Sequence, residues 1–204
     1  MTSAAPPRPA ASSSKGGSSA LATWLLWTAG FLVFPVAGLA GTAAAGPVDD
    51  PLAALLGGAV AGLLIGAGHA LVSRRRLPAL RWCAATAVGM GVGLLLGASV
   101  VAYATGLGDL AVQGALTGLV LGPAQALALP TGTERRRRLL WAAAGPPLWA
   151  LGWTVTTLAG VGVGARFTVF GAFGALTYSA LSGLLLVVVL GRSAGARAAH
   201  RSSS

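Results

Sequence analysis

The succession of apolar segments is the feature that most constrains how this chain can fold. Six runs follow one another with almost no charge inside them, and each is close to the roughly 20 residues that a bilayer-crossing helix needs. They cover Leu21–Gly41, Leu52–Val72, Trp82–Tyr103, Leu110–Leu129, Leu139–Gly160 and Phe167–Leu190. Only 9% of the 204 residues are charged, whereas a soluble domain carries about 25%. The sequence therefore predicts an all-α, polytopic transmembrane bundle of six helices.

The basic residues lie almost entirely on one side of this predicted bundle. Of the 14 lysines and arginines, only Arg166 falls in a loop on the other side. That other side also holds three of the four acids, namely Asp49, Asp50 and Asp109. Because basic loops stay inside the cell, we expect both termini in the cytoplasm, with the bundle in a bacterial cytoplasmic membrane.

The ends of the chain differ in composition from the apolar part. Residues 1–20 are rich in Ala, Pro, Ser and Gly and are predicted to be a disordered cytoplasmic tail. Residues 21–190 form the membrane domain, and 191–204 form a basic cytoplasmic tail. The basic start, the first apolar run and Ala43-x-Ala45 together also imitate a cleavable signal peptide. The first run is longer than the 7–15 residues typical of such peptides, so we expect it to stay as a helix.

Three helix pairs show the same internal spacing. In the first helix of each pair, a tryptophan is followed eleven residues later by a glycine. These pairs are Trp27 and Gly38, Trp82 and Gly93, and Trp141 and Gly152. Eleven residues are close to three helical turns, so both side chains share a face, with the tryptophan expected at the membrane interface.

The second helix of each pair carries a stripe of small residues that ends in a polar side chain. The three copies are Gly58, Gly62, Gly66 with His69; Gly114, Gly118, Gly122 with Gln125; and Gly171, Ala175, Ser179 with Ser182. Such stripes let helix backbones approach closely in lipid, so the six glycines of the first two copies are predicted packing positions. The sequence therefore predicts three tandem helical hairpins that repeat every ~57 residues and enter the membrane in the same direction.

The pattern GxxxGxxQ or GxxxGxxH, followed by arginines and a tryptophan, resembles a family of small glycine-rich multi-pass bacterial membrane proteins. The resemblance covers roughly residues 21–190 and implies a fold but no activity. His69 stands where that family more often has glutamine, and Ser182 replaces the amide in the third copy.

The three polar residues at the ends of the stripes are the candidate site. They cannot face lipid without a large free-energy cost, so we expect His69, Gln125 and Ser182 inside the bundle. His69 could relay a proton or bind a substrate. Alternatively, these side chains hydrogen-bond across helices and hold the repeats in register.

The loops carry further predictions. Two arginine clusters either bind anionic lipid head groups or only fix the topology; they are Arg74, Arg75, Arg76, Arg135, Arg136, Arg137 and Arg138. Asp50 before Pro51 and Asp109 before Leu110 are predicted N-caps. Prolines inside the apolar runs predict kinks at Pro35, Pro123, Pro146 and Pro147.

These features favour a non-enzymatic accessory or assembly subunit that binds a membrane partner or a second copy of itself. The alternative is a small transporter or channel, whose path would be lined by His69, Gln125 and Ser182. No enzyme, cofactor or metal site is expected, since the aspartates lie across the membrane from His69 and the chain has two histidines and one cysteine. The positive charge is assigned to lipid contact, and nucleic acid is not an expected partner. A shared hydrated cavity at His69 and Gln125 would favour transport, and a dry interface would favour the accessory role.

Overall fold

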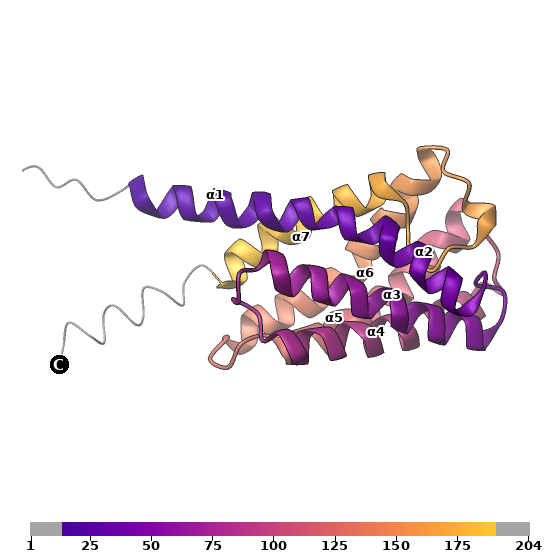
Figure 1. Cartoon of the computed structure of the whole chain (residues 1–204), viewed down its shortest axis with the longest axis horizontal. Coiled ribbons are helices and arrows are strands. Elements are labelled where there is room, and N and C mark those ends of the chain that lie inside the picture. Colours follow the sequence, from indigo (N-terminus) through magenta and orange to yellow (C-terminus); the bar gives the residue numbers. More distant parts are fainter. Residues whose placement is uncertain (1–13, 191–204) are drawn as a thin grey trace, which may run out of the picture.

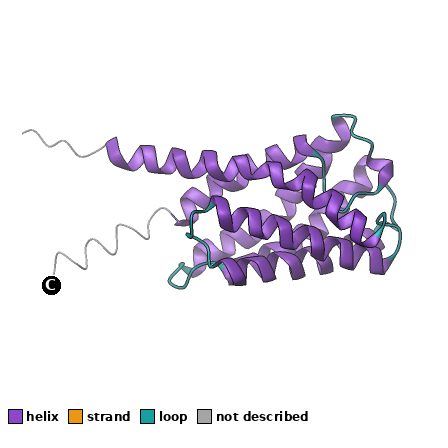
Figure 2. Ribbon diagram, viewed as in Figure 1, coloured by secondary structure: helices purple, strands orange, loops and turns teal. Residues whose placement is uncertain are grey.

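The computed structural model describes residues 14–190, and this part of the chain is helical without strands (Figure 2). The first rod is made of α1 (Ser14–Ala29), the 3₁₀ helix η1 (Gly30–Leu32) and α2 (Val33–Ala45). It is followed by α3 (Pro51–Val72), α4 (Ala79–Val100), α5 (Leu107–Ala128), α6 (Arg135–Leu158), the short 3₁₀ helix η2 (Val163–Ala165) and α7 (Ala172–Leu190). The predicted all-α bundle is confirmed.

The structure describes only part of the predicted tails. Residues 1–13 and 191–204 lie outside the described residues. Residues 14–20, predicted to be tail, belong to α1, which begins well before the predicted start at Leu21.

Within residues 14–190, five helices are long and apolar enough to cross a membrane, which fits a multi-pass membrane protein. They are Ser19–Ala45, Pro51–Val72, Ala79–Val100, Leu107–Ala128 and Ala172–Leu190. The helix α6 is equally long, but its tryptophans, threonines and adjacent prolines make it less apolar than the others. The sixth predicted span therefore rests on the position of α6 between α5 and α7, both of which it contacts.

The helices form a closed ring in chain order. Each helix packs on the next one along the chain, and α7 returns to lie beside α1 (Figure 1). Successive loops lie at alternate ends of the ring. The α3–α4 loop, with Arg74–Arg76, and the start of α6, with Arg135–Arg138, are therefore at the same end. We call this the arginine-rich end. The first turns of α1 extend past it (Figure 1).

Pro35 accounts for the break in the first rod. A proline inside a helix lacks an N–H and its ring clashes with the carbonyl four residues earlier, which here belongs to Phe31. The 3₁₀ turn Gly30–Leu32 lies at that position. By contrast, α5 and α6 continue through Pro123 and through Pro146–Pro147 without such an interruption.

The two predicted N-caps have different outcomes. The Asp50 carboxylate accepts hydrogen bonds from the amides of Leu52 (2.7 Å) and Ala53 (2.9 Å), so this cap is confirmed. The Asp109 prediction is wrong, because α5 begins at Leu107 and its N-cap position is Gly106. Asp109 lies instead in the first turn, where its charge still favours the positive end of the helix.

The sixth apolar run starts as a non-helical segment with a bend at Thr168 and Val169. Helix α7 begins only at Ala172, and the residues before it are buried inside the bundle: Thr168, Val169 and Phe170. The Thr168 side chain fills a notch between α2 and α3, where a Cβ added to Gly41 or Gly57 would lie 2.6 Å from it. Its hydroxyl donates to the Gly38 carbonyl (3.3 Å). This segment therefore fills the ring at the end opposite the arginines.

Candidate functional site

The six predicted packing glycines lie where neighbouring helices approach each other closely. On α3, a Cβ added to Gly62 would lie 2.6 Å from the Thr86 carbonyl of α4, and Gly58 and Gly66 also face α4. On α5, a Cβ on Gly114 would lie 2.6 Å from the Trp149 carbonyl, with Gly118 and Gly122 also against α6. The small residues thus join the second helix of one pair to the first helix of the next.

Three tryptophans meet at the centre of the ring, near its arginine-rich end. The ring centroids of Trp27 and Trp82 are 6.3 Å apart, those of Trp27 and Trp141 are 6.1 Å apart, and those of Trp82 and Trp141 are 5.7 Å apart. All three pairs are edge-to-face, the geometry that aromatic quadrupoles favour. We call this arrangement the tryptophan triangle. All three side chains are buried, so at this end of the ring they pack against one another and not against lipid.

Two of the candidate polar residues bind indoles of the tryptophan triangle. The Trp27 indole donates to the Ser182 hydroxyl (2.9 Å), and the Trp141 indole donates to the Gln125 carbonyl oxygen (3.2 Å). The Gln125 amide nitrogen in turn donates to the Thr86 hydroxyl of α4 (3.1 Å). Gln125 and Ser182 are buried, so these bonds connect helices through the interior.

His69 differs from the other two. Its imidazole stacks on Trp27 with a centroid distance of 4.1 Å and is only 1% exposed. Neither imidazole nitrogen has a hydrogen-bond partner, and the same is true of the Trp82 indole. Trp141 donates to Gln125 of the preceding helix pair and Trp27 to Ser182 of the last pair, and the same order around the ring would join Trp82 to His69. The cross-helix hydrogen bond predicted for His69 is therefore not found.

The space around this site is very small. A hollow of about 10 Å³ lies beside Gln125, Trp141 and Ser182, which is on the order of one water molecule. His69 does not line it. The described residues therefore bring the three polar side chains around one aromatic cluster, and the small hollow beside Gln125 and Ser182 does not extend to His69.

No protein family, curated protein or solved structure matches this chain.

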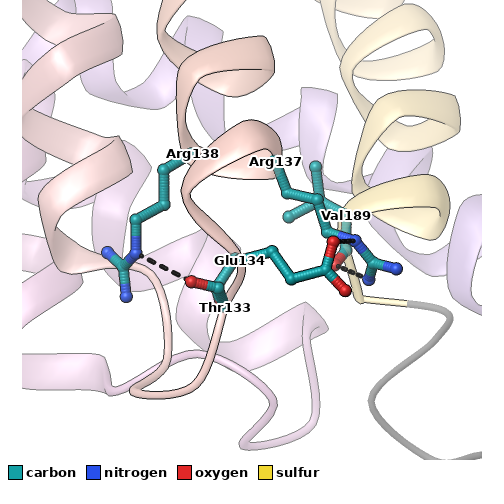
Figure 3. Close-up of polar contacts among 5 residues, drawn as sticks. All are labelled: Thr133, Glu134, Arg137, Arg138 and Val189. Carbon is teal, nitrogen blue, oxygen red and sulfur yellow. Dashed lines mark hydrogen bonds and ion pairs between the residues drawn. The ribbon is translucent and has the colours of Figure 1, made fainter.

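Two arginines at the start of α6 bind the ends of neighbouring helices. Figure 3 shows the contact of Arg137 with Val189 of α7 and the hydrogen bond from Arg138 to the Thr133 carbonyl. Arg137 donates to the Val189 carbonyl of α7 (2.8 Å) and forms an ion pair with Glu134 (3.4 Å). Arg138 donates to the carbonyls of Leu129 (3.1 Å) and Pro130 (2.9 Å), and also to the last turn of α5. Positive charge is unfavourable at a helix N-terminus. Here the two guanidinium groups donate to carbonyls at the C-terminal ends of α5 and α7, which have no partners within their own helices.

The remaining arginines of the two clusters are more exposed. Arg76 hydrogen-bonds the Thr23 hydroxyl of α1, and Arg81 of α4, outside the clusters, donates to the Leu127 carbonyl (3.0 Å). Arg74, Arg75, Arg135 and Arg136 are exposed, and these four are the residues that remain available for lipid head groups.

Several important residues are not evident from the sequence. No sequence motif predicts that Thr86 accepts a hydrogen bond from Gln125. Threonines in helices commonly donate to the carbonyl four residues earlier, as Thr86 also does, so the sequence gives no sign of a second partner. Thr168, Val169 and Phe170 lie in an apolar run that suggests only a helix. These residues pack against Gly38, Gly41 and Gly57, and this contact can be recognised only once the positions of α2 and α3 are known.

Proposed function

We propose that this protein is a non-enzymatic membrane protein that acts as an accessory or assembly subunit. The observation that carries the proposal is the interior of the ring at the candidate site. A path for a solute needs room and polar groups that are free to bind it, but tryptophans occupy the space between His69, Gln125 and Ser182. Gln125 and Ser182 use their polar atoms on indoles, which makes them parts of the framework.

The proposal includes six crossings of a bacterial cytoplasmic membrane with both termini in the cytoplasm. It is supported by the common location of Arg74–Arg76 and Arg135–Arg138 at one end of the ring. It is also supported by the contacts of α6 with α5 and α7, because a helix packed between two spans has no other route.

The first rod supplies the surface for a partner. The start of α1 extends past the arginine-rich end (Figure 1). On the same helix, Leu21 and Leu25 are more than half exposed. A helix that leaves the bundle at this end can contact a second protein at the membrane surface without disturbing the ring.

The proposal is tested by cross-linking in native membranes. Cys83→Ser removes the cysteine of the chain, and Leu21→Cys then places one photoreactive group on α1. Leu107→Cys, on the opposite end of the ring, is the matched control. We expect one defined adduct from the Leu21 variant, either with a second protein or with another copy of the chain, and none from the control. If neither variant gives an adduct, and purified protein carries solutes across liposome membranes, the accessory role is refuted.

Transport remains the second candidate because of one observation. His69 and Trp82 leave three polar atoms without partners in the interior, and such atoms often bind water. If His69 relays protons, proteoliposomes will acidify faster than empty liposomes and His69→Gln will abolish the difference. We expect no difference between proteoliposomes and empty liposomes.

A further inference from the structure

The positive charge at the arginine-rich end is not balanced by acidic side chains of this sequence. The sequence has four side-chain carboxylates, and three of them, Asp49, Asp50 and Asp109, lie at the opposite end of the ring. The fourth, Glu134, forms an ion pair with Arg137 (3.4 Å). The other arginines at this end have no further carboxylate side chain in the sequence to pair with, so the anions that neutralise them come from outside it.

The arginines at this end divide into two groups. In the first group, each side chain donates to a backbone carbonyl or a hydroxyl of a neighbouring helix; this group is Arg76, Arg81, Arg137 and Arg138. In the second group, every side chain is exposed and makes no hydrogen bond or ion pair with residues 14–190; this group is Arg74, Arg75, Arg135 and Arg136. We call these four the outer arginines.

The local backbone gives no reason for arginine at the four outer positions. Arg74 and Arg75 have a left-handed backbone (φ 50° and 64°), which glycine adopts with less strain. Arg135 and Arg136 are the first residues of α6, where a positive charge opposes the helix dipole. The fold therefore does not account for these side chains, which indicates that they act on something outside the chain.

The outer arginines of the two loops belong to one surface. Arg81 near the start of α4 and Arg138 near the start of α6 both donate to the Leu127 carbonyl, at 3.0 Å and 3.3 Å. The end of α5 therefore joins the turn that carries Arg74 and Arg75 to the start of α6. Guanidinium groups that are held close together repel one another and attract a common anion.

Exposed leucines beside the outer arginines indicate the depth of this surface in the bilayer. Leu71 is 80% exposed and lies three residues before Arg74, and Leu139 is 57% exposed and lies four residues after Arg135. Three to four helical residues rise by about 5–6 Å, so each arginine lies within about one turn of a side chain that faces hydrocarbon. A guanidinium at that depth lies in the head-group layer, which favours a lipid phosphate over an acidic protein as its partner.

We propose that the arginine-rich end binds an anionic phospholipid through the outer arginines, with the lipid phosphate between the α3–α4 loop and the start of α6. A guanidinium group can donate two parallel hydrogen bonds to phosphate oxygens, and the acyl chains lie against Leu71 and Leu139. A zwitterionic lipid binds less well, because its own ammonium group offsets the phosphate. This lipid site goes beyond the accessory role and does not depend on it.

The test measures which lipids stay bound to the full chain. The chain is reconstituted in nanodiscs with equal amounts of phosphatidylglycerol and phosphatidylcholine, and is then released and weighed with its retained lipids by native mass spectrometry. Both leaflets have the same composition, so a variant that inserts in the opposite direction meets the same lipids. We expect phosphatidylglycerol to be retained in at least fivefold excess, and the excess to fall as the salt concentration of the buffer rises.

The two pairs of outer arginines are neutralised separately and then together. One basic residue near an anionic surface contributes about 1 kcal/mol, which corresponds to about fivefold in binding. Arg74→Gln with Arg75→Gln, or Arg135→Gln with Arg136→Gln, should therefore lower the ratio of anionic to zwitterionic lipid at least fivefold. All four changes together should bring the ratio close to that of the disc. Arg166→Gln removes a charge at the opposite end and should leave the ratio unchanged.

A charge-preserving variant separates lipid binding from folding. Lysine at all four outer positions keeps the charge and should keep most of the excess, and thermal unfolding verifies the fold of each variant. Equal retention of the two lipids by the unmodified chain, or an undiminished excess in the fourfold glutamine variant, overturns the proposal. If that variant retains its lipids but loses an acidic protein that co-purifies from native membranes, the outer arginines bind the protein and the proposal is again overturned.

Discussion

The close approach of α5 and α6 gives a quantitative prediction for Gly122→Ala. A Cβ at this position would lie 2.6 Å from the Ala142 carbonyl, whereas ordinary van der Waals contact begins at 3.4 Å. The helices must therefore separate by roughly 0.8 Å, enough to lose a quarter to a half of the attraction between the atoms that face each other there. Overpacking of this kind costs about 1–3 kcal/mol. The better helix propensity of alanine returns up to about 1 kcal/mol, so we expect a net destabilisation of about 1–2 kcal/mol.

Gly108→Ala is the matched control in the same helix. A Cβ at Gly108 meets nothing within 4 Å, so this variant gains propensity without a clash. We expect its free energy of unfolding to be unchanged or to rise by up to about 1 kcal/mol. Both variants are compared by denaturant titration in mixed micelles, followed by tryptophan fluorescence. A Gly122→Ala variant at least as stable as Gly108→Ala would show that α5 and α6 do not pack through this glycine.

Three further predictions concern single side chains. Arg137→Ala leaves the Val189 carbonyl without its charged donor and should lower the free energy of unfolding by about 1.5–3 kcal/mol in the same titration, whereas Arg136→Ala, at an exposed position, should change it by less than about 0.5 kcal/mol. His69→Gln provides an acceptor for the Trp82 indole at the cost of the stacking on Trp27, and a rise of about 1 kcal/mol is expected; a fall would show that His69 already has a partner such as water. Asp50→Ala removes the cap of α3 and should cost about 0.5–2 kcal/mol, while a reporter fused at Asp50 should report the extracytoplasmic side.

The sequence alone determines the class of fold and much of the helix packing. Apolar runs near the length of a bilayer span predict helices, because backbone groups in lipid must bond within their own segment. Glycines spaced by four residues predict the faces of α3 and α5, since a stripe without side chains is where another backbone fits. The burial of His69, Gln125 and Ser182 follows from the cost of polar groups in hydrocarbon.

The partners of these residues depend on the tertiary structure. The sequence places Trp27, Trp82 and Trp141 at equivalent positions, but only the closure of α7 onto α1 brings them into one triangle. Likewise, the residues before α7 look helical in sequence but are not helical in the structure, where Thr168 lies in the notch left by Gly38, Gly41 and Gly57. Local periodicity reports which face of a helix avoids lipid, but the contact that this face makes depends on helices distant in the chain.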